Sequence, residues 1–461
     1  MGVAATPRIV AAAVAALALP LGALAVGSPE LALAGIFALG FLALTARDAA
    51  AGVAAFTILA LIGHISVLAS TPAVKLAGIV LVLALLRNHV ALLRLLHDHP
   101  AIAWLAIFFV AWAVASSLWA RDAHLALGSA FRLALGVIFA FVVYAAIRDR
   151  RQMLWLIAAL IAGAVLALLA GALELTAAGP ASRLGGGVGD ANQLASLLVP
   201  ALALATFLLF SGRSYWAKAL IGVSLLAMSV ALLLTESRGG LVALAVSIPT
   251  AIVCAGALRK RMIIASVAVL VIGLGYYSYV ATPASAQRLT SFSAEGGAGR
   301  LDLWSVAGSV IEDRPFLGVG AGNFPAVEAV YAAGTQNLPN VDVVVSKLVV
   351  HNTYLELLAE LGPLGLLSFA GIAGAAIVAA IRAIRISNAA ADRELEFFAR
   401  GTLVAIVGLL VAVFFFSGEY EKHLWLVLGL GLATLSVATR SARQESLTGS
   451  GPALHPAPTT R

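Results

Sequence analysis

Two arginines at the ends of long apolar stretches are well suited to bind a phosphate. Arg238 lies in the segment Thr235–Gly240 between two apolar runs, and Arg300 follows Gly299 in a longer polar segment. The planar guanidinium group of arginine binds two oxygens at once and keeps its charge at physiological pH. Arg238 is therefore either a phosphate ligand or one half of a local ion pair with Glu236.

A histidine and a polar stripe open the apolar segment that follows position 350. His351 could take a proton from a hydroxyl nucleophile, because an imidazole titrates near neutral pH. A lone histidine is, however, more often structural than catalytic. Asn352, Glu356 and Glu360 recur at every fourth position, which places them on one side of a helix beside an apolar stripe that contains Tyr354. His351, Asn352 and Tyr354 are therefore candidate site residues.

A glycine-rich segment runs from Arg183 to Asn192. Asp190 and Asn192, at its end, can cap the helix predicted after them. The segment is therefore either a flexible loop with a helix cap or a part of the binding site.

A short amphipathic helix is predicted after Arg300. Leu301, Trp304 and Ile311 fall at helical spacing together with Gly308, and Pro315 ends the pattern. We expect this helix to lie on the outer membrane surface. The run of alternating glycines from 318 to 322 has no preceding strand and is a poor match to a dinucleotide-binding fingerprint.

Arg132 lies inside an apolar run, where a charge is costly and requires a partner. It is either a third phosphate contact or one half of a buried pair with Asp122 or another acid.

The chain has one cysteine and none of the HExxH, CxxC, GxSxG or Walker motifs. We therefore expect a metal-free site, with no cofactor, built from arginine and histidine.

The composition places these residues in a membrane protein. Of the 461 residues, 62% are hydrophobic and 11% are charged, whereas a soluble domain is about one quarter charged. This composition excludes a soluble enzyme, a disordered chain and a nucleic-acid-binding domain, despite the net charge of +7. The fold class expected is an all-α polytopic membrane protein, surrounded by membrane lipids and without a nucleic acid partner.

Fourteen apolar stretches approach the length that crosses a bilayer, about 20 residues. They are Ile9–Val26, Leu31–Ala46, Ala51–Ser70, Val74–Leu86, Ala101–Leu118, Leu125–Ile147, Met153–Leu173, Gln193–Phe210, Ala217–Leu234, Gly239–Leu258, Met262–Val280, Tyr354–Ile381, Gly401–Ser417 and Leu424–Thr439. The second and the fourth are short, so the expected bundle has about 12–14 transmembrane helices.

The loop charges predict the orientation of this bundle. With the N-terminus inside, the inner loops hold 18 Lys and Arg residues and the outer loops hold nine. This bias places both termini in the cytoplasm. The longest loop, 281–350, and all four polar clusters then lie on the outer side. Residues 1–440 form the helical bundle with that loop, and 441–461 are expected to be a disordered cytoplasmic tail.

The polar clusters, taken in order, resemble the O-antigen ligase and polymerase superfamily of bacterial membrane glycosyltransferases. The resemblance is carried by ordered motifs over 112–367: Gly189-Asp190-Ala-Asn192-Gln-Leu-Ala, Thr235-Glu-Ser-Arg238-Gly-Gly, Gly299-Arg300-x3-Trp304, Pro315-Phe-Leu-Gly318-Val-Gly320-Ala-Gly322-Asn-Phe324 and His351-Asn352-x-Tyr354-Leu-x4-Glu360-x-Gly362. Each motif is weak by itself, and the ordered set is quite specific.

The resemblance implies a GT-C-like bundle in the bacterial inner membrane. It implies transfer of a glycan from undecaprenyl pyrophosphate to an acceptor hydroxyl on the outer face, either of the lipid A core or of a growing glycan. It also implies that Arg238 and Arg300 contact the pyrophosphate and that His351 lies near the reaction centre. Asp190, Asn192, Asn352, Tyr354 and Trp304 are the further substrate contacts expected, with Arg132 as a possible third phosphate ligand.

Three functions fit these observations. We favour an O-antigen ligase, which transfers one glycan to the lipid A core. The first alternative is an O-antigen or exopolysaccharide polymerase, which extends a lipid-linked chain. The alternative from another class is a transporter or flippase for a lipid-linked sugar, against which stands the lack of an internal repeat.

Overall fold

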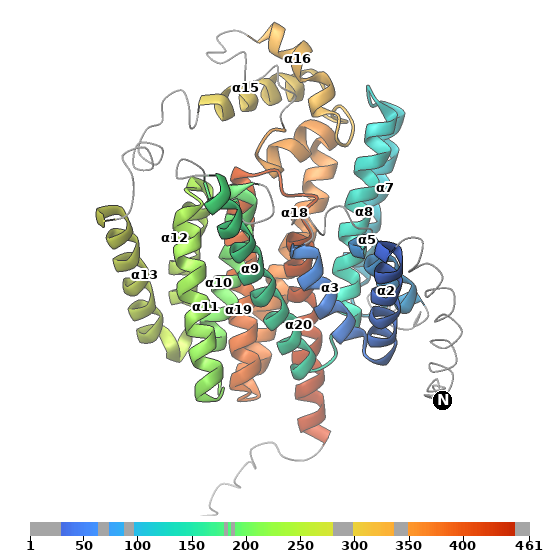
Figure 1. Ribbon diagram of the computed structural model, residues 1–461. Helices are drawn as coiled ribbons and strands as arrows, with labels where there is room; N and C mark the ends of the chain where they lie inside the picture. Colours follow the sequence, from blue (N-terminus) through green and yellow to red (C-terminus); the bar gives the residue numbers. More distant parts are fainter. Residues whose placement is uncertain are drawn as a thin grey trace, which may run out of the picture.

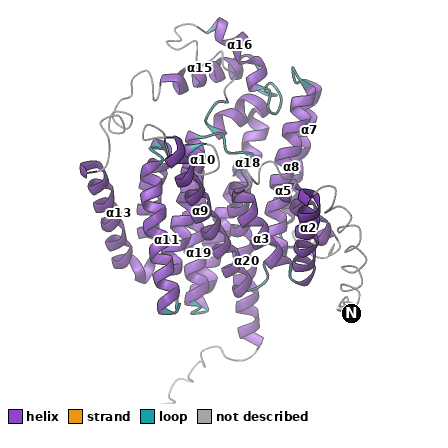
Figure 2. Ribbon diagram, in the orientation of Figure 1, coloured by secondary structure: helices purple, strands orange, loops and turns teal. Residues whose placement is uncertain are grey.

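The computed structural model describes residues 29–62, 73–86, 96–178, 183–185, 190–279, 298–335 and 349–447. Within these ranges every regular element is a helix, as Figure 2 shows. The α-helices are α2 (Pro29–Arg47), α3 (Ala49–Ile62), α5 (Ala73–Leu86), α7 (Pro100–Ala115), α8 (Ala123–Ala146), α9 (Arg150–Ala178), α10 (Ala191–Leu209), α11 (Tyr215–Leu234), α12 (Arg238–Cys254), α13 (Arg259–Tyr279), α15 (Ala298–Asp313), α16 (Phe324–Gly334), α18 (Thr353–Ala389), α19 (Arg393–Ala412) and α20 (Lys422–Leu447).

The helix lengths confirm an all-α multi-pass membrane protein. Within the described ranges, nine helices are long and apolar enough to cross a membrane, and four shorter apolar helices accompany them. These thirteen helices fall on thirteen of the fourteen predicted spans. The remaining prediction, Ile9–Val26, lies outside the described residues, as does the second half of Ala51–Ser70.

Side-chain caps fix where several helices begin. The side chains of Asp122, Asp190, Ser237, Asn352 and Asp392 accept hydrogen bonds from backbone N–H groups in the first turns of α8, α10, α12, α18 and α19, respectively. Such caps satisfy N–H groups that have no partner within the helix. Three of these five caps lie in the polar segments singled out in the sequence, so there the residues that interrupt the apolar runs also set the ends of the helices.

Small residues allow the central helices to pack closely. Gly136 of α8 faces the buried indole ring of Trp425 in α20, and Gly429 of α20 lies against the backbone of Ala140. Close approach of this kind stabilises helix pairs in a bilayer, where lipid tails are as apolar as the side chains. Helix α13, in contrast, lies at the edge of the bundle in Figure 1, with its main contacts to α11 and α12.

Helix α18 is kinked near its N-terminal end. Gly362 has a φ of 65° there, and Pro363 follows it. Only glycine adopts this backbone conformation without strain, and proline removes one helical hydrogen bond. The Trp112 indole N–H of α7 donates to the Leu361 carbonyl oxygen at 2.8 Å, which satisfies an acceptor that the kink would otherwise expose. The kink separates residues 353–361 from the long membrane segment.

Helices α15 and α16 lie over one end of the bundle, the upper end in Figure 1. The expected amphipathic helix is present as α15, and its position on a membrane surface stays a prediction. Leu303, Val306 and Val310 are buried where the helix packs against α16 and the start of α18. Leu301, of the predicted apolar stripe, is 59% exposed.

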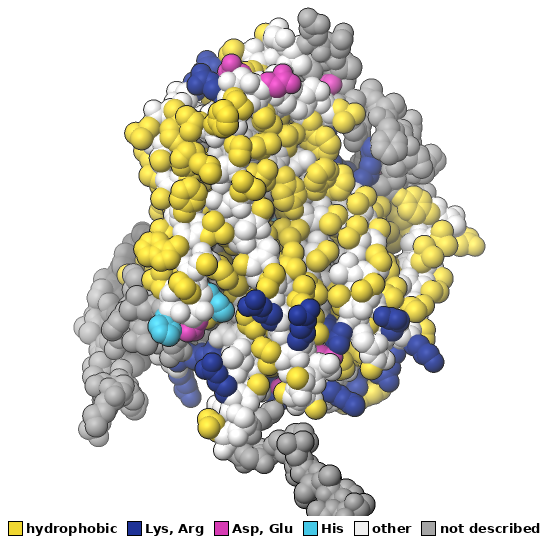
Figure 3. Space-filling view, turned by 180° about the vertical axis from the view of Figure 1, so that it is seen from behind, with side chains coloured by type: hydrophobic (Ala, Val, Ile, Leu, Met, Phe, Trp, Pro, Cys, Tyr) yellow, Lys and Arg dark blue, Asp and Glu magenta, His cyan; other side chains and the backbone are white. Residues whose placement is uncertain are grey.

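The opposite end carries most of the cationic side chains. Figure 3 shows Lys and Arg gathered along the lower edge of a broad apolar belt, at the end where α20 terminates. Ion pairs of Arg150 with Asp392 and of Arg213 with Glu394 join α9, the start of α11 and α19 there. Helix α20 continues to Leu447, so the first seven residues of the predicted tail, 441–447, are helical, and the rest of that prediction lies outside the described residues.

Candidate functional site

The loop before α10 is fastened to the turn between α11 and α12. The Ser237 hydroxyl donates to the Asn192 side-chain oxygen at 2.8 Å, and the Arg183 guanidinium donates to the Thr235 carbonyl oxygen at 2.9 Å. Asp190 caps α10 beside them through the N–H groups of its first turn. The first two polar clusters of the sequence therefore form one structural unit, within which Asn192 connects α10 to α12.

Arginines from three different segments converge above this unit. Arg300, near the start of α15, lies within electrostatic range of Arg183 and Arg238, with Asp190 as the opposing charge. Burial and the two neighbouring arginines lower the pKa of the Arg300 guanidinium, although an arginine stays charged near neutral pH. The charges of Arg183 and Arg238 repel that of Arg300 at the end of the bundle that α15 covers. A bound dianion would relieve this repulsion.

His351 completes the cluster. Its pKa is lowered by burial and by the charge of Arg300, while Asp190 acts in the opposite direction. The imidazole is therefore neutral near pH 7 and can accept a proton. Its Nδ1 atom is buried and has no hydrogen-bond partner among the residues that the structure describes. The structure thus brings together four predicted residues, Arg238, Arg300, His351 and Asp190, and adds Arg183.

The backbone of His351 is held in an unusual conformation by the loop between α19 and α20. Its φ is 56°, a value that non-glycine residues seldom adopt. The His351 N–H donates to the Ser417 hydroxyl oxygen at 2.9 Å, and the Ser417 hydroxyl donates to the Glu356 carboxylate. Thr353 adds two hydrogen bonds to the same loop, accepting from the Gly418 N–H and donating to the Phe416 carbonyl oxygen. These contacts fix the position of the imidazole ring.

Glu360 anchors the glycine-rich loop 318–324 to α18. Its carboxylate accepts hydrogen bonds from the N–H groups of Gly322 at 2.6 Å and Phe324 at 3.1 Å. The Gly320 N–H also donates to the Glu360 carbonyl oxygen at 2.8 Å. The polar stripe of Glu356 and Glu360 thus faces the protein interior, where it positions the loops on either side of the site.

Substituting Gly318 by alanine is expected to destabilise this loop. Gly318 has a φ of 66°, and an added Cβ would press on the backbone of Glu360. A left-handed conformation costs a non-glycine residue about 1–3 kcal/mol. Thermal unfolding should therefore show a lower midpoint for Gly318→Ala. The matched control is Gly308→Ala in α15, where a Cβ meets open space, and its midpoint should be unchanged or higher. Equal midpoints for the two variants would contradict this account.

Arg132 lies outside the arginine cluster. Its guanidinium stacks on the Tyr420 ring at 4.2 Å and donates to the Ser129 hydroxyl at 2.9 Å. Glu356 and Glu360 lie within electrostatic range, so the acids that balance Arg132 come from α18. The carboxylate of Asp122, the other partner considered, instead caps α8. Of the two interpretations of Arg132, this arrangement favours the buried charge pair.

Three other predicted contacts form hydrogen bonds within the protein. Trp304 donates from its indole N–H to the Val350 carbonyl oxygen at 3.1 Å, and the Tyr354 hydroxyl donates to the Leu410 carbonyl oxygen at 2.7 Å. Asn352 caps α18. Both aromatic rings also pack on Phe414, with centroids 5.8 Å and 6.2 Å from it. These residues form the apolar side of the site.

An apolar groove begins beside these rings. It has a volume of about 440 Å³ and lies between α12, α18 and α19. Its lining residues are Val242, Tyr354, Ile377, Val407, Leu410, Val411, Phe414 and Phe415. Val242 is one helical turn after Arg238, so the groove starts next to the cationic cluster.

The segment between α19 and α20 contains residues that sequence reasoning did not single out. Burial raises the pKa of the Glu419 carboxyl to about 8 and raises the pKa of Glu421 as well. The sequence signal for this segment is a run of five polar or ionisable residues, 419–423, between two apolar spans.

The described residues contain no group of three or more His, Cys, Asp or Glu side chains arranged to hold a metal ion.

Comparison with known proteins supports an interpretation in terms of glycan transfer. No curated protein matches the chain significantly. Residues 223–370 match a family model described as O-Antigen ligase. This segment contains Arg238, Arg300 and His351, while Arg183 and Asp190 precede it. Over residues 223–370, about a third of its length, the chain is similar to the O-antigen ligase family.

Proposed function

We propose that the protein is an O-antigen ligase. It transfers a glycan from undecaprenyl pyrophosphate to a hydroxyl of the lipid A core at the outer face of the inner membrane. The observation that carries this proposal is the convergence of Arg183, Arg238 and Arg300 beside a neutral, buried His351. A cluster of like charges is unfavourable by itself, so its natural counterpart is a multiply charged anion such as a pyrophosphate.

The transfer requires one proton acceptor and one stabilised leaving group. The imidazole of His351 takes the proton from the acceptor hydroxyl as the oxygen attacks the anomeric carbon of the donor. The bond between that carbon and the pyrophosphate oxygen breaks, and its electron pair remains on the pyrophosphate. The guanidinium groups of Arg238 and Arg300 stabilise this developing charge. Attack from the side opposite the leaving group inverts the anomeric centre, and no divalent cation is needed.

The apolar groove supports the assignment of a polyprenyl-linked glycan as the donor. Its opening lies one helical turn from Arg238 and is bordered by Tyr354 and Phe414. A lipid whose pyrophosphate is bound at the arginines can thus place the first part of its hydrocarbon chain in the groove. The donor would then reach the site sideways from the membrane, between α12 and α18.

A reconstituted transfer assay in EDTA tests the proposal. Purified protein receives an undecaprenyl-pyrophosphate oligosaccharide with or without the lipid A core, and the products are separated by size. We expect a single core-linked product that forms in EDTA. A ladder of longer lipid-linked chains made without the core would instead identify a polymerase. Transport of intact donor without any product would support a flippase, and loss of activity in EDTA would contradict the metal-independent mechanism.

A further inference from the structure

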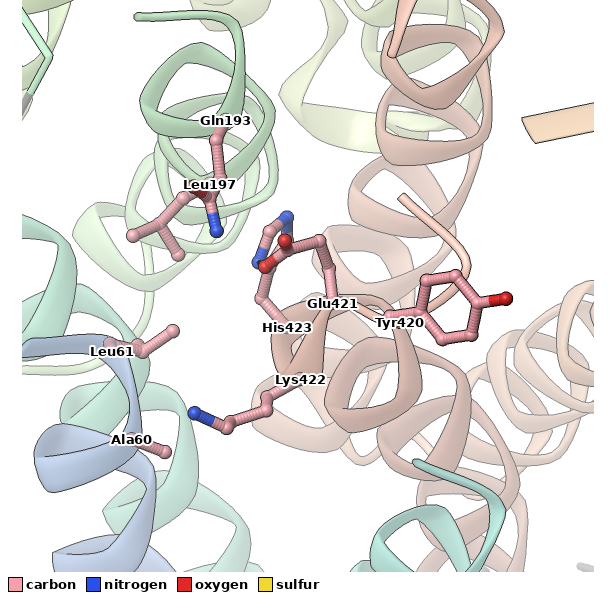
Figure 4. Close-up of a pocket in the computed structure, with 8 residues that line it drawn as sticks. All are labelled: Ala60, Leu61, Gln193, Leu197, Tyr420, Glu421, Lys422 and His423. Carbon is pink, nitrogen blue, oxygen red and sulfur yellow. Dashed lines mark ion pairs between the residues drawn. The ribbon is translucent and has the colours of Figure 1, made fainter. Parts of the chain in front are cut away.

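A second, smaller cavity lies at the ends of α3, α10 and α20 that face the outer side in the predicted topology. Its volume is about 80 Å³. Figure 4 shows the residues that line it, which are Ala60 and Leu61 of α3, Gln193 and Leu197 of α10, and Tyr420, Glu421, Lys422 and His423 at the start of α20. The cavity is unusual for a membrane protein because polar side chains supply half of its wall.

The polar groups of the wall are held in defined positions. The Ser196 hydroxyl oxygen lies 2.9 Å from Nε2 of His423, and Nδ1 of His423 lies 3.6 Å from the Glu421 carboxylate. Gln193 forms a side-chain hydrogen bond with the same carboxylate. Both ring nitrogens of His423 are thereby engaged, so the imidazole orientation is fixed and the Glu421 carboxylate is kept at the cavity.

Lys422 is the wall residue whose charge is not balanced by a direct contact. In Figure 4 its side chain extends toward Ala60 and Leu61, away from Gln193. Within the described part of the chain, its ammonium group has no hydrogen-bond acceptor and no ion pair within 4.0 Å, although Glu421 acts on it at longer range. A largely buried ammonium group without acceptors is costly. A ligand with hydroxyl oxygens would supply them.

The cavity lies beside the arginine cluster. Asp190 acts electrostatically on Glu421, and it also acts on Arg300 and on His351. Gln193 follows Asp190 by three residues, which is about one turn of α10. The cavity and the arginine cluster therefore share Asp190 as a neighbour.

We propose that this cavity binds the terminal sugar of the acceptor, an inference that rests on the proposed function. Lys422 donates to the sugar hydroxyl oxygens, and Glu421 accepts from hydroxyl protons. A phosphate would face the Glu421 carboxylate, and a hydrocarbon chain would leave the Lys422 ammonium without acceptors, so neither fits as well as a polyol. A volume of about 80 Å³ equals that of two or three water molecules. The cavity therefore holds the edge of one sugar ring and leaves the rest of the acceptor outside.

Transfer kinetics with the full-length protein in lipid nanodiscs test this site. The concentrations of lipid A core and of undecaprenyl-pyrophosphate oligosaccharide are varied separately for the wild type and for Lys422→Met. We expect the KM for the core to rise about tenfold or more, as for loss of a hydrogen bond to a charged group, with the KM for the donor within twofold of wild type. Ala60→Val, which narrows the cavity without removing a charge, should also change the KM for the core. Lys218→Met, an exposed lysine on α11, is the matched control.

The possible outcomes separate the two proposals. An active wild type together with an unchanged core KM in Lys422→Met and Ala60→Val would overturn the acceptor site alone. A rise in the KM for the donor, with an unchanged KM for the core, would assign Lys422 to donor binding. This result would also overturn the acceptor site. A wild type that makes no product with the core, or with a lipid-linked repeat unit as acceptor, would refute the transferase and the acceptor site together. Saturation-transfer NMR of deacylated core oligosaccharide with His351→Asn protein gives a readout without turnover, and the signal should weaken when Lys422→Met is added.

Discussion

Replacing Arg300 by alanine is expected to abolish glycan transfer, with a loss of about a thousandfold or more, the upper range for removing one preorganised donor. Arg300 is largely buried beside two other arginines, and this environment lowers its pKa. A buried charge with two like charges beside it is costly unless an anion binds there. The measurement is kcat/KM for the undecaprenyl-linked donor in the reconstituted assay.

Protein stability distinguishes loss of catalysis from loss of folding in this variant. Removing Arg300 relieves repulsion from Arg183 and Arg238, so the thermal midpoint of Arg300→Ala should equal or exceed that of the wild type. Arg300→Lys keeps the charge but not the two-pronged donor geometry, and it should retain partial activity. Arg314→Ala, at the exposed far end of α15, should behave as the wild type. Full activity of Arg300→Ala would remove Arg300 from the phosphate site.

Replacing His351 is expected to slow transfer by about a hundredfold or more, the range for losing a general base. Asparagine is the better replacement for this test because it tolerates the left-handed backbone at position 351, whereas alanine would add backbone strain. His351→Asn should fold with a thermal midpoint close to that of the wild type. His124→Asn, at the exposed start of α8, is the matched control and should keep full activity.

The pH dependence of transfer gives a second test of His351. Burial and Arg300 lower the imidazole pKa below its ordinary value of 6.5, so the base form predominates at pH 7. Activity should fall only when the pH drops through this lowered value. The acid limb of kcat/KM in the wild type should therefore have its midpoint below 6.5 and should be absent in His351→Asn. An identical acid limb in both proteins would show that His351 only positions the acceptor.

The sequence was sufficient to predict the helices, two arginines of the cationic cluster and the histidine beside them. Arg238, Arg300 and His351 each stand at the start of a helix or just before one, where an apolar run meets a polar segment. Such a boundary is visible from composition, and its side follows from the loop charges. The sequence did not identify Arg183 as a member, because the loop that carries it reaches the site through contacts with Thr235, more than fifty positions later in the chain.

Which face of a helix is buried was harder to predict. Glu356 and Glu360 form a polar stripe that in a soluble protein would face water, yet both are 2% exposed. In a membrane the surrounding lipid is apolar, so polar side chains are better accommodated inside the protein, where Ser417 and the 322–324 backbone serve as partners. In α15, two overlapping apolar stripes were present, and the one that packs on α16 and α18 became the buried face.

The support of His351 by Ser417 has a consequence for recombination between related transferases. The family match ends at residue 370, but the histidine within it is held in place by a loop at 416–418, and Asp190 acts on it from before the match begins. A chimera that exchanges only residues 223–370 would place the two arginines and the histidine in a protein whose other residues come from a different sequence. Breakpoints that preserve activity should therefore fall before 183 and after 423, so that the segment is inherited with both of its flanks.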